Sequence, residues 1–182
     1  MHSVVHRGWQ SGQYLAPDPI YLDASVVVGW LTTADRLHAR ATSFIGDHLA
    51  ASRTIQVSLL ALDETIYRLL RGLVAAARGI PPSRVALGYE MKKNQQLLGT
   101  FQPNIQQALG YLAAWATVVD GRGAPVTQIV SSWLDRFTDV GGLHDAYHLS
   151  LAEHSGAHSF VTGDADFKTV GKLPTPMYVI TL

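Results

Sequence analysis

The segment Ile20-Tyr21-Leu22-Asp23-Ala24-Ser25 is a short apolar run that ends on an acidic residue. Three later segments have the same apolar, β-branched or aromatic character and predict further strands: 54–58, 159–162 and 177–180. Long stretches with apolar residues at helical spacing separate these runs. Strands that alternate with helices predict an α/β fold, with a central, mostly parallel twisted sheet flanked by helices on both faces.

The helical periodicity also sets the expected domain organisation. Residues 1–18 show no sustained period, so we expect an irregular N-terminal extension, followed by a single domain over residues 19–182 with an extra helical segment at 80–125. Residues 26–31 fit either a strand or a helix. Ser58 is a suitable N-cap for a helix that runs to Gly79. The expected helices span residues 35–51, 59–79, 83–98, 104–116, 126–137 and 143–154.

The composition is typical of a globular domain. Hydrophobic residues make up 47% of the 182 residues and charged residues 15%, which is enough apolar material for a buried core. The absence of cysteine excludes disulfides and thiolate metal sites. No segment is a secretory leader or a membrane span, so we expect a cytoplasmic protein. The formal net charge of zero argues against nucleic-acid binding by the whole surface, although a local basic patch is compatible with it.

Four acidic residues lie at the ends of these elements: Asp23, Glu64, Asp145 and Asp164. The carboxyl ends of parallel strands meet at one edge of a sheet, where α/β proteins bind their ligands. Two carboxylates about 4 Å apart repel each other by about 4 kcal/mol at an effective dielectric constant near 20, so a cluster of four requires a cation. Oxygen ligands without cysteine favour Mg²⁺ or Mn²⁺, and the sequence therefore predicts a site for one or two of these ions.

Four motifs resemble a known family. Leu22–Ser25, Leu62–Thr65, Leu143–Ala152 and Val161–Phe167 are similar, in order and spacing, to the signatures of PIN-domain nucleases, especially the VapC-type toxins of toxin–antitoxin pairs. The resemblance covers about residues 20–170, and the run Thr162-Gly163-Asp164-Ala165-Asp166-Phe167 is its most specific part.

This resemblance implies a PIN-like fold and a metal-dependent endoribonuclease that leaves a 5′-phosphate and a 3′-hydroxyl. The expected partners are RNA, a protein antitoxin and a second copy of the chain in a homodimer. Asp23, Glu64, Asp145 and Asp164 would then be the catalytic, metal-binding acids, with Asp166 as an auxiliary acid. Ser25, Thr162 and His148 would be polar or packed neighbours that orient these groups.

The resemblance leaves the RNA-binding surface to be inferred. A phosphodiester backbone requires basic partners. The candidates are Arg68, Arg71, Arg84, Lys92 and Lys93, although exposed basic residues on helices are often no more than a solvated face.

Two other functions compete with the nuclease. His144 and His148 share a helix face, as in a zinc peptidase. On an uninterrupted helix, however, His154 lies about 80° around from His144 and cannot join the same ion. A noncatalytic module that binds RNA or protein is the second alternative. Taken one at a time, the acids also fit turn, capping or helix-dipole roles.

Overall fold

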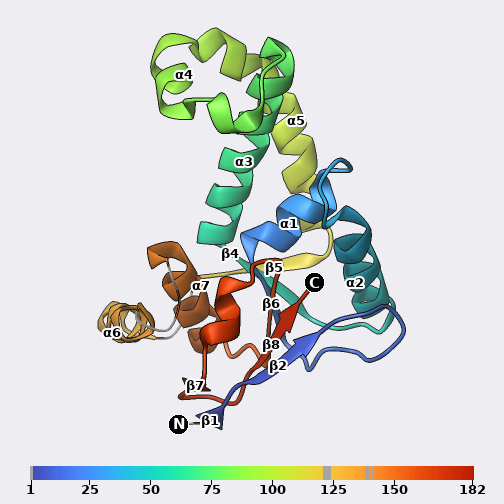
Figure 1. Ribbon diagram of the computed structural model, residues 1–182, viewed down its shortest axis with the longest axis vertical. Coiled ribbons are helices and arrows are strands. Elements are labelled where there is room, and N and C mark those ends of the chain that lie inside the picture. Colours follow the sequence, from blue (N-terminus) through green and yellow to red (C-terminus); the bar gives the residue numbers. More distant parts are fainter. Residues whose placement is uncertain (1, 121–123, 138–139, 141) are drawn as a thin grey trace.

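The computed structural model describes residues 2–120, 124–137, 140 and 142–182. Its centre is a six-stranded sheet in which all neighbouring strands run parallel. Helices lie on both faces of the sheet (Figure 1), which confirms the α/β class predicted from the sequence. In their order across the sheet the strands are β2 (Val5–Gly8), β8 (Tyr178–Thr181), β6 (Ser159–Thr162), β3 (Ile20–Leu22), β4 (Ile55–Ser58) and β5 (Ala116–Val119).

The strand side chains alternate between two hydrophobic cores, one on each face of the sheet. In β3, Ile20 and Leu22 join the core that contains Phe44, whereas Tyr21 joins the core that contains Leu149. Because both faces are covered, the strands are apolar at consecutive positions, as is usual for parallel sheets. The central strands are therefore fully buried.

The helix that follows β4 begins and ends where the sequence predicts. The Ser58 hydroxyl accepts a hydrogen bond from the Ala61 N–H at 3.0 Å, and Gly79 ends the helix at φ 62°, a left-handed conformation that glycine adopts without strain. Residues 26–31, which fitted a strand or a helix, are helical. The helices are α1 (Ala24–Leu31), α2 (His38–Ala50), α3 (Leu59–Arg78), α4 (Leu87–Lys93), α5 (Gln95–Ala113), α6 (Val126–Arg136) and α7 (Leu143–His154), with 3-10 turns η1 (Pro82–Arg84) and η2 (Asp166–Thr169).

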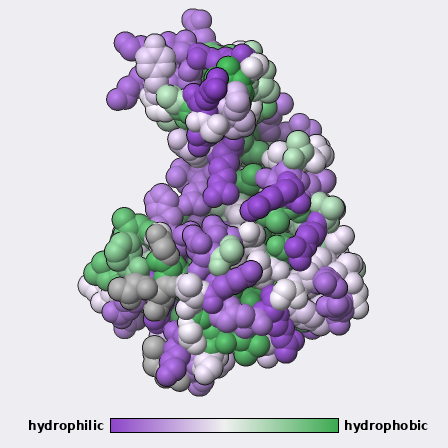
Figure 2. All heavy atoms as spheres, in the orientation of Figure 1, coloured by the Kyte–Doolittle hydropathy of each residue, from purple (hydrophilic) through white to green (hydrophobic). Residues whose placement is uncertain are grey.

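The second half of α3, with η1, α4 and the start of α5, forms a helical extension that stands away from the sheet (Figure 1). It has a small hydrophobic core of its own, which includes Val74, Val85 and Leu87, with Phe101 packed against them. Most of its surface in the view of Figure 2 is hydrophilic. The extension overlaps only the first part of the expected extra helical segment at 80–125. The later part of that segment contains β5, which pairs with β4 in the central sheet, and residues 121–123 lie outside the described part.

Two expected helix boundaries within this segment are wrong. The predicted break near Pro103 is absent, and the chain instead breaks at Asn94, between α4 and α5. A proline in a helix loses one hydrogen bond. Here Ile105 is buried and Phe101 packs on the core of the extension, so contacts on both sides of Pro103 offset that loss.

The N-terminal segment is not irregular, contrary to the prediction for residues 1–18, of which Met1 lies outside the described part. β1 (His2–Ser3) pairs antiparallel with β7 (Lys172–Leu173), and β2 is the edge strand beside β8. Trp9 is buried against Phe44, with ring centroids 5.1 Å apart. The strand residues of β2 are all exposed and have no apolar period. These residues form a strand because they pair with the edge of β8, and their own sequence carries no pattern that predicts a strand.

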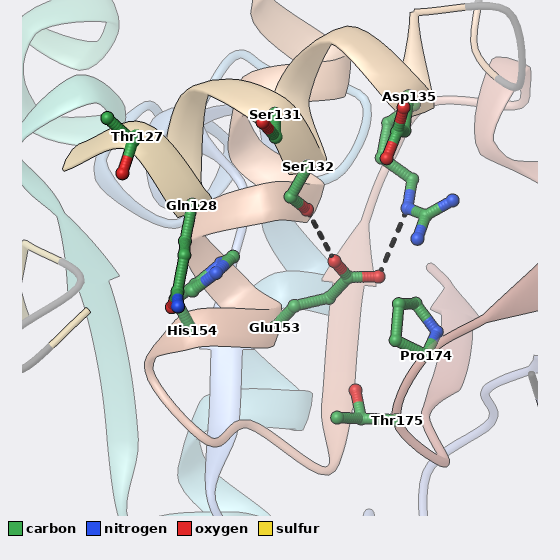
Figure 3. A pocket seen from close by; sticks show the side chains of 10 residues that line it. Thr127, Gln128, Ser131, Ser132, Asp135, Glu153, His154, Pro174 and Thr175 are labelled. Carbon is green, nitrogen blue, oxygen red and sulfur yellow. Dashed lines mark hydrogen bonds and ion pairs between the residues drawn. The ribbon is translucent and has the colours of Figure 1, made fainter. Parts of the chain in front are cut away.

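Helix α6 is held against α7 by a buried ion pair. Arg136 Nε lies 3.2 Å from Glu153 Oε1, and the Ser132 hydroxyl donates to Glu153 Oε2 at 2.8 Å (Figure 3). Both charged side chains are 5% exposed. They form one wall of a cleft of about 490 Å³ that is also lined by Gln128 and His154.

The opposite side of α6 carries an apolar stripe. Val126, Val130, Leu134 and Phe137 are all exposed and recur at helical spacing. Figure 2 shows apolar side chains gathered over this helix. Within the described ranges, none of the helices combines the length and apolar character needed to cross a membrane.

Replacement of Arg136 by methionine should destabilise the protein by about 3–5 kcal/mol, because it leaves the Glu153 carboxylate buried without its partner. The measurement is the free energy of unfolding from denaturant titration. In the double variant Arg136→Met/Glu153→Leu, most of the loss should be recovered, since no unpaired charge remains. Equal stability of the single variant and the wild type would contradict a structural role for this pair.

Candidate metal centre

The pairing of β3 with β6 brings two of the predicted acids to one edge of the sheet. Leu22 lies opposite Val161 in the register, and the Asp23 N–H donates to the Val161 carbonyl at 2.9 Å. Asp23 follows β3 directly, and Asp164 lies two residues after the end of β6. Asp23 occupies the N-cap position of α1, but its side chain makes no capping hydrogen bond. The carboxylate is therefore available for another role.

Two hydroxyl groups fix the orientation of Asp23. The Ser25 and Thr162 hydroxyls donate to Asp23 Oδ2 at 2.6 and 2.9 Å. The same two oxygens accept the backbone N–H groups of Gly163 and Asp164, both at 2.9 Å. These bonds connect the loop after β6 to the start of α1, whereas Asp23 Oδ1 lies 3.7 Å from His148 Nε2.

The loop after β6 packs closely on Leu37 at Gly163. A Cβ atom at Gly163 would overlap Leu37 Cδ1 and lie 3.4 Å from the Ser25 hydroxyl, so a larger residue there would require the Leu37 side chain to move. Glycine between Thr162 and Asp164 therefore fits the close packing beside the hydroxyl groups around Asp23.

Glu64 and His148 complete a compact group with Asp23. His148 Nε2 lies 3.3 Å from Glu64 Oε2 and 3.7 Å from Asp23 Oδ1. One ligand atom from each of these three residues lies within 4.8 Å of the other two. Burial raises the pKa of Glu64, but the hydrogen bond and charge of His148, with smaller effects of His144 and Arg68, outweigh it, and the pKa falls below its ordinary value. Glu64 is therefore ionised near neutral pH.

Asp145 lies in the first turn of α7 and is half-buried beside this group. Burial raises the pKa of Asp145, and the negative charges of Asp23 and Asp164 raise it further. Gly142 leaves the space for its carboxylate, since a Cβ atom there would lie 2.5 Å from Asp145 Oδ2. The charges of Asp23 and Asp164 therefore act on Asp145 in the direction that repulsion between carboxylates predicts, in addition to the larger effect of burial.

The remaining acids lie at the rim. Asp164 is exposed, and its Oδ1 accepts the Asp166 N–H at 3.0 Å, so part of its hydrogen-bonding capacity serves its own loop. Asp166 is also exposed, at the start of η2. The structure therefore brings ligand atoms of Asp23, Glu64 and His148 within 4.8 Å of one another, with Asp145 and Asp164 close enough to interact by charge.

His148 and Tyr21 are the residues that the sequence did not assign to the centre of this group. The sequence placed His148 as a packed or polar neighbour, whereas it faces two carboxylates directly and is fully buried. The available signal was the i, i+3 spacing from Asp145, which puts both side chains on one face of a helix. Nothing in the sequence indicated a role for Tyr21 other than its place in an apolar strand.

The histidines do not form a three-histidine site. His148 is buried, whereas His144 is 72% exposed and binds the other oxygen of Glu64, with Nδ1 3.0 Å from Oε1. His154 Nδ1 bonds the Ser150 carbonyl at 2.8 Å, and its ring lines the cleft beside Glu153 (Figure 3). His154 therefore lies apart from the other two, as the helix geometry predicted, whereas His144 and His148 both contact Glu64.

The predicted basic contacts are spread over a wide area. Arg68 lines a pocket of about 300 Å³ with Glu64 and His144, next to the acids. Arg71 Nε donates to the Pro82 carbonyl at 2.6 Å and so holds the turn of the helical extension. The other three candidates, Arg84 on η1 and Lys92 and Lys93 on α4, lie in that extension.

A parallel sheet with acids gathered at its carboxyl edge defines the class of domain that the sequence motifs resemble. Residues 20–173 match the family model described as PIN domain, and the chain belongs to this family. No curated protein matches the chain.

Solved structures share the fold. VapBC2 from Rickettsia felis, bound to a DNA fragment from its promoter, is similar with a TM-score of 0.50 and 18% identity over 88% of this chain and 98% of that chain. FitAcB from Neisseria gonorrhoeae is similar with a TM-score of 0.52 and 16% identity over 89% of this chain and 96% of that chain. At these identities the likeness shows a common fold.

Replacement of Asp145 by asparagine should stabilise the metal-free protein at neutral pH. The raised pKa means that the folded state binds this proton more tightly than the unfolded chain does. The ionised Asp145 carboxylate thus destabilises the folded protein at neutral pH, and this destabilisation disappears when the pH falls below 3.8, the ordinary pKa of the group. The measurement is the free energy of unfolding against pH in the presence of a chelator.

The exposed acid Asp63, replaced by asparagine, is the matched control and should show no such pH-dependent gain. If Asp145→Asn is less stable than the wild type at pH 7 without metal, the ionised Asp145 carboxylate does not destabilise the folded protein.

Proposed function

We propose that the protein is a metal-dependent endoribonuclease that acts as the toxin of a toxin–antitoxin pair. The observation that carries this proposal is the convergence of Asp23 and Glu64, with Asp145 beside them, at the carboxyl edge of the sheet. Membership of the PIN domain family and the resemblance of the four motifs to VapC-type toxins support it.

The side chains present fit a divalent cation. Both hydroxyl groups that donate to Asp23 bind Oδ2, the pKa of Glu64 is lowered, and burial, together with the charges of Asp23 and Asp164, raises the pKa of Asp145. A hard dication relieves that repulsion. Asp23, Glu64, Asp145 and Asp164 would hold one or two ions, Mg²⁺ or Mn²⁺, with Asp166 as an auxiliary acid.

When bound, such an ion supplies a water of lowered pKa and charge neutralisation at a phosphate. The chain itself contributes the placement of the ligands. Ser25 and Thr162 hold Asp23 Oδ2, so that rotation of the carboxylate away from the site costs two hydrogen bonds. The resulting cleavage would leave a 5′-phosphate and a 3′-hydroxyl.

A basic cleft at the same edge of the sheet is suited to the phosphate backbone of the substrate. Arg7, Arg40 and Lys168 line a cleft of about 560 Å³ together with Gly8 and Thr181, the last residues of β2 and β8. All three basic side chains are exposed. Phosphate contacts of this kind position a strand without reading its sequence. We add these residues to Arg68, Arg71, Arg84, Lys92 and Lys93 as candidate RNA contacts.

The apolar stripe of α6 supports the proposed antitoxin partner. The stripe lies on the helix that packs on α7, and α7 carries Asp145 and His148. A bound antitoxin segment would cover Val130 and Leu134 and remove this apolar surface from water. A homodimer remains our expectation from the resemblance to VapC-type toxins.

The decisive experiment is RNA cleavage by metal-stripped protein after addition of Mg²⁺, Mn²⁺ or Zn²⁺. We expect cleavage with Mg²⁺ or Mn²⁺. The variants Asp23→Asn and Asp145→Asn should lose at least roughly 10–100-fold in rate, the loss typical of groups that only support a metal ligand.

The matched control is Asp63→Asn, an exposed acid next to Glu64, which should retain wild-type activity. Cleavage restored by Zn²⁺ alone would favour the peptidase type of site, and wild-type activity of both variants would exclude the acidic group as the catalytic centre.

Replacement of Lys168 by glutamine should weaken RNA binding, because one phosphate contact with a single strand is lost. The negative slope of log K against log salt should become shallower by about 0.7. Fluorescence anisotropy with a labelled oligonucleotide at several salt concentrations measures this slope. The control is Lys172→Gln, on β7 outside the six-stranded sheet. If Lys168→Gln keeps the wild-type slope, as the control should, the basic cleft does not bind the RNA backbone.

A further inference from the structure

His148 occupies an unusual position for a histidine. Its side chain is fully buried on α7, yet Nε2 faces two carboxylate oxygens, at 3.3 Å from Glu64 Oε2 and 3.7 Å from Asp23 Oδ1. A buried polar nitrogen without a suitable partner is costly. The position therefore requires either a proton or a cation between the ring and the acids.

The other ring nitrogen is held by a buried relay. The Tyr21 hydroxyl lies 2.8 Å from His148 Nδ1 and donates to the Ser58 hydroxyl at 2.6 Å. Ser58 in turn accepts the Ala61 N–H as the N-cap of α3. Since the phenol proton is directed to Ser58, the phenol oxygen accepts from Nδ1–H. A neutral imidazole carries one proton, so Nε2 then presents its lone pair to the acids.

Packing keeps this relay in place. Tyr21 stacks on Phe160 with ring centroids 5.6 Å apart, and its ring meets that of His148 edge-on at 6.1 Å. Burial raises the pKa of Tyr21, so the phenol stays neutral and can serve as an acceptor. In proteins, a metal-binding histidine is oriented in this way by a partner on its second nitrogen.

We propose that His148 Nε2 is a direct ligand of the bound ion, together with Asp23 Oδ1 and Glu64 Oε2, and that this mixed nitrogen–oxygen site selects Mn²⁺ over Mg²⁺. The inference rests on the metal-dependent function proposed above and narrows the choice of ion. Imidazole binds first-row transition ions more strongly than it binds Mg²⁺, which prefers oxygen ligands and retains water. Tyr21 is the positioning residue that fixes the ring.

A purely structural role for His148 makes a different prediction. If the ring only bridges Glu64 and Asp23 by a hydrogen bond, the ion binds through oxygens alone, and removal of the imidazole leaves the preference between Mn²⁺ and Mg²⁺ unchanged. Nitrogen coordination can therefore be tested without measuring catalysis.

The test uses the metal-stripped, full-length protein titrated with Mn²⁺ or Mg²⁺. Electron spin echo measurements on the Mn²⁺ complex should show coupling to a ¹⁴N nucleus that changes when the protein is labelled with ¹⁵N-histidine. In calorimetry, His148→Asn and Tyr21→Phe should weaken Mn²⁺ binding by roughly 10–100-fold and reduce the Mn²⁺ to Mg²⁺ affinity ratio. Because the nitrogen coupling is measured on the wild-type protein, this part of the test does not depend on whether a variant folds.

The matched control is His144→Asn, because this exposed histidine also contacts Glu64 and should leave the nitrogen coupling unchanged. Mn²⁺ bound without nitrogen coupling would overturn His148 as a ligand, and the metal-dependent nuclease would still stand. If neither ion binds the wild type, the proposed function fails together with this inference.

Discussion

The hydrogen bonding of β3 to β6 is the interaction on which the rest of the site depends. It places Asp23 and the loop that carries Asp164 side by side, and the Thr162 hydroxyl extends the same pairing to Asp23 Oδ2. The apolar residues of these two strands are buried on both faces. Burial of this surface supplies free energy that offsets the repulsion between the carboxylates that the strands bring together.

The same strand connects the core of the protein to its candidate chemistry. Leu22 packs in one core, whereas Tyr21 packs in the other and reaches His148 through its hydroxyl group. Ser58 is both the N-cap of α3, the helix that carries Glu64, and the acceptor of the Tyr21 proton. Strand order, the start of α3 and the orientation of the His148 ring are therefore coupled through a few buried hydrogen bonds.

Several features could be predicted from the sequence because they depend on local rules. Apolar runs identified β3, β4, β6 and β8, and the Ser58 cap and Gly79 located both ends of α3. The order of the acidic motifs indicated the PIN domain family, which the family match confirms. The N-terminal strands and the helix through Pro103 were not predicted, because a free sheet edge and contacts on either side of a proline decide them.

By itself, the sequence determined the α/β alternation, the family and the set of acidic residues, because periodicity, capping and motif spacing act over neighbouring positions. Only the tertiary structure decided which side chains meet. It placed His148 between Glu64 and Asp23, gave Tyr21 its role behind the ring, and gathered Arg7, Arg40 and Lys168 in one cleft. These contacts join positions far apart in the chain, and they follow from strand order and helix packing, which no local pattern encodes.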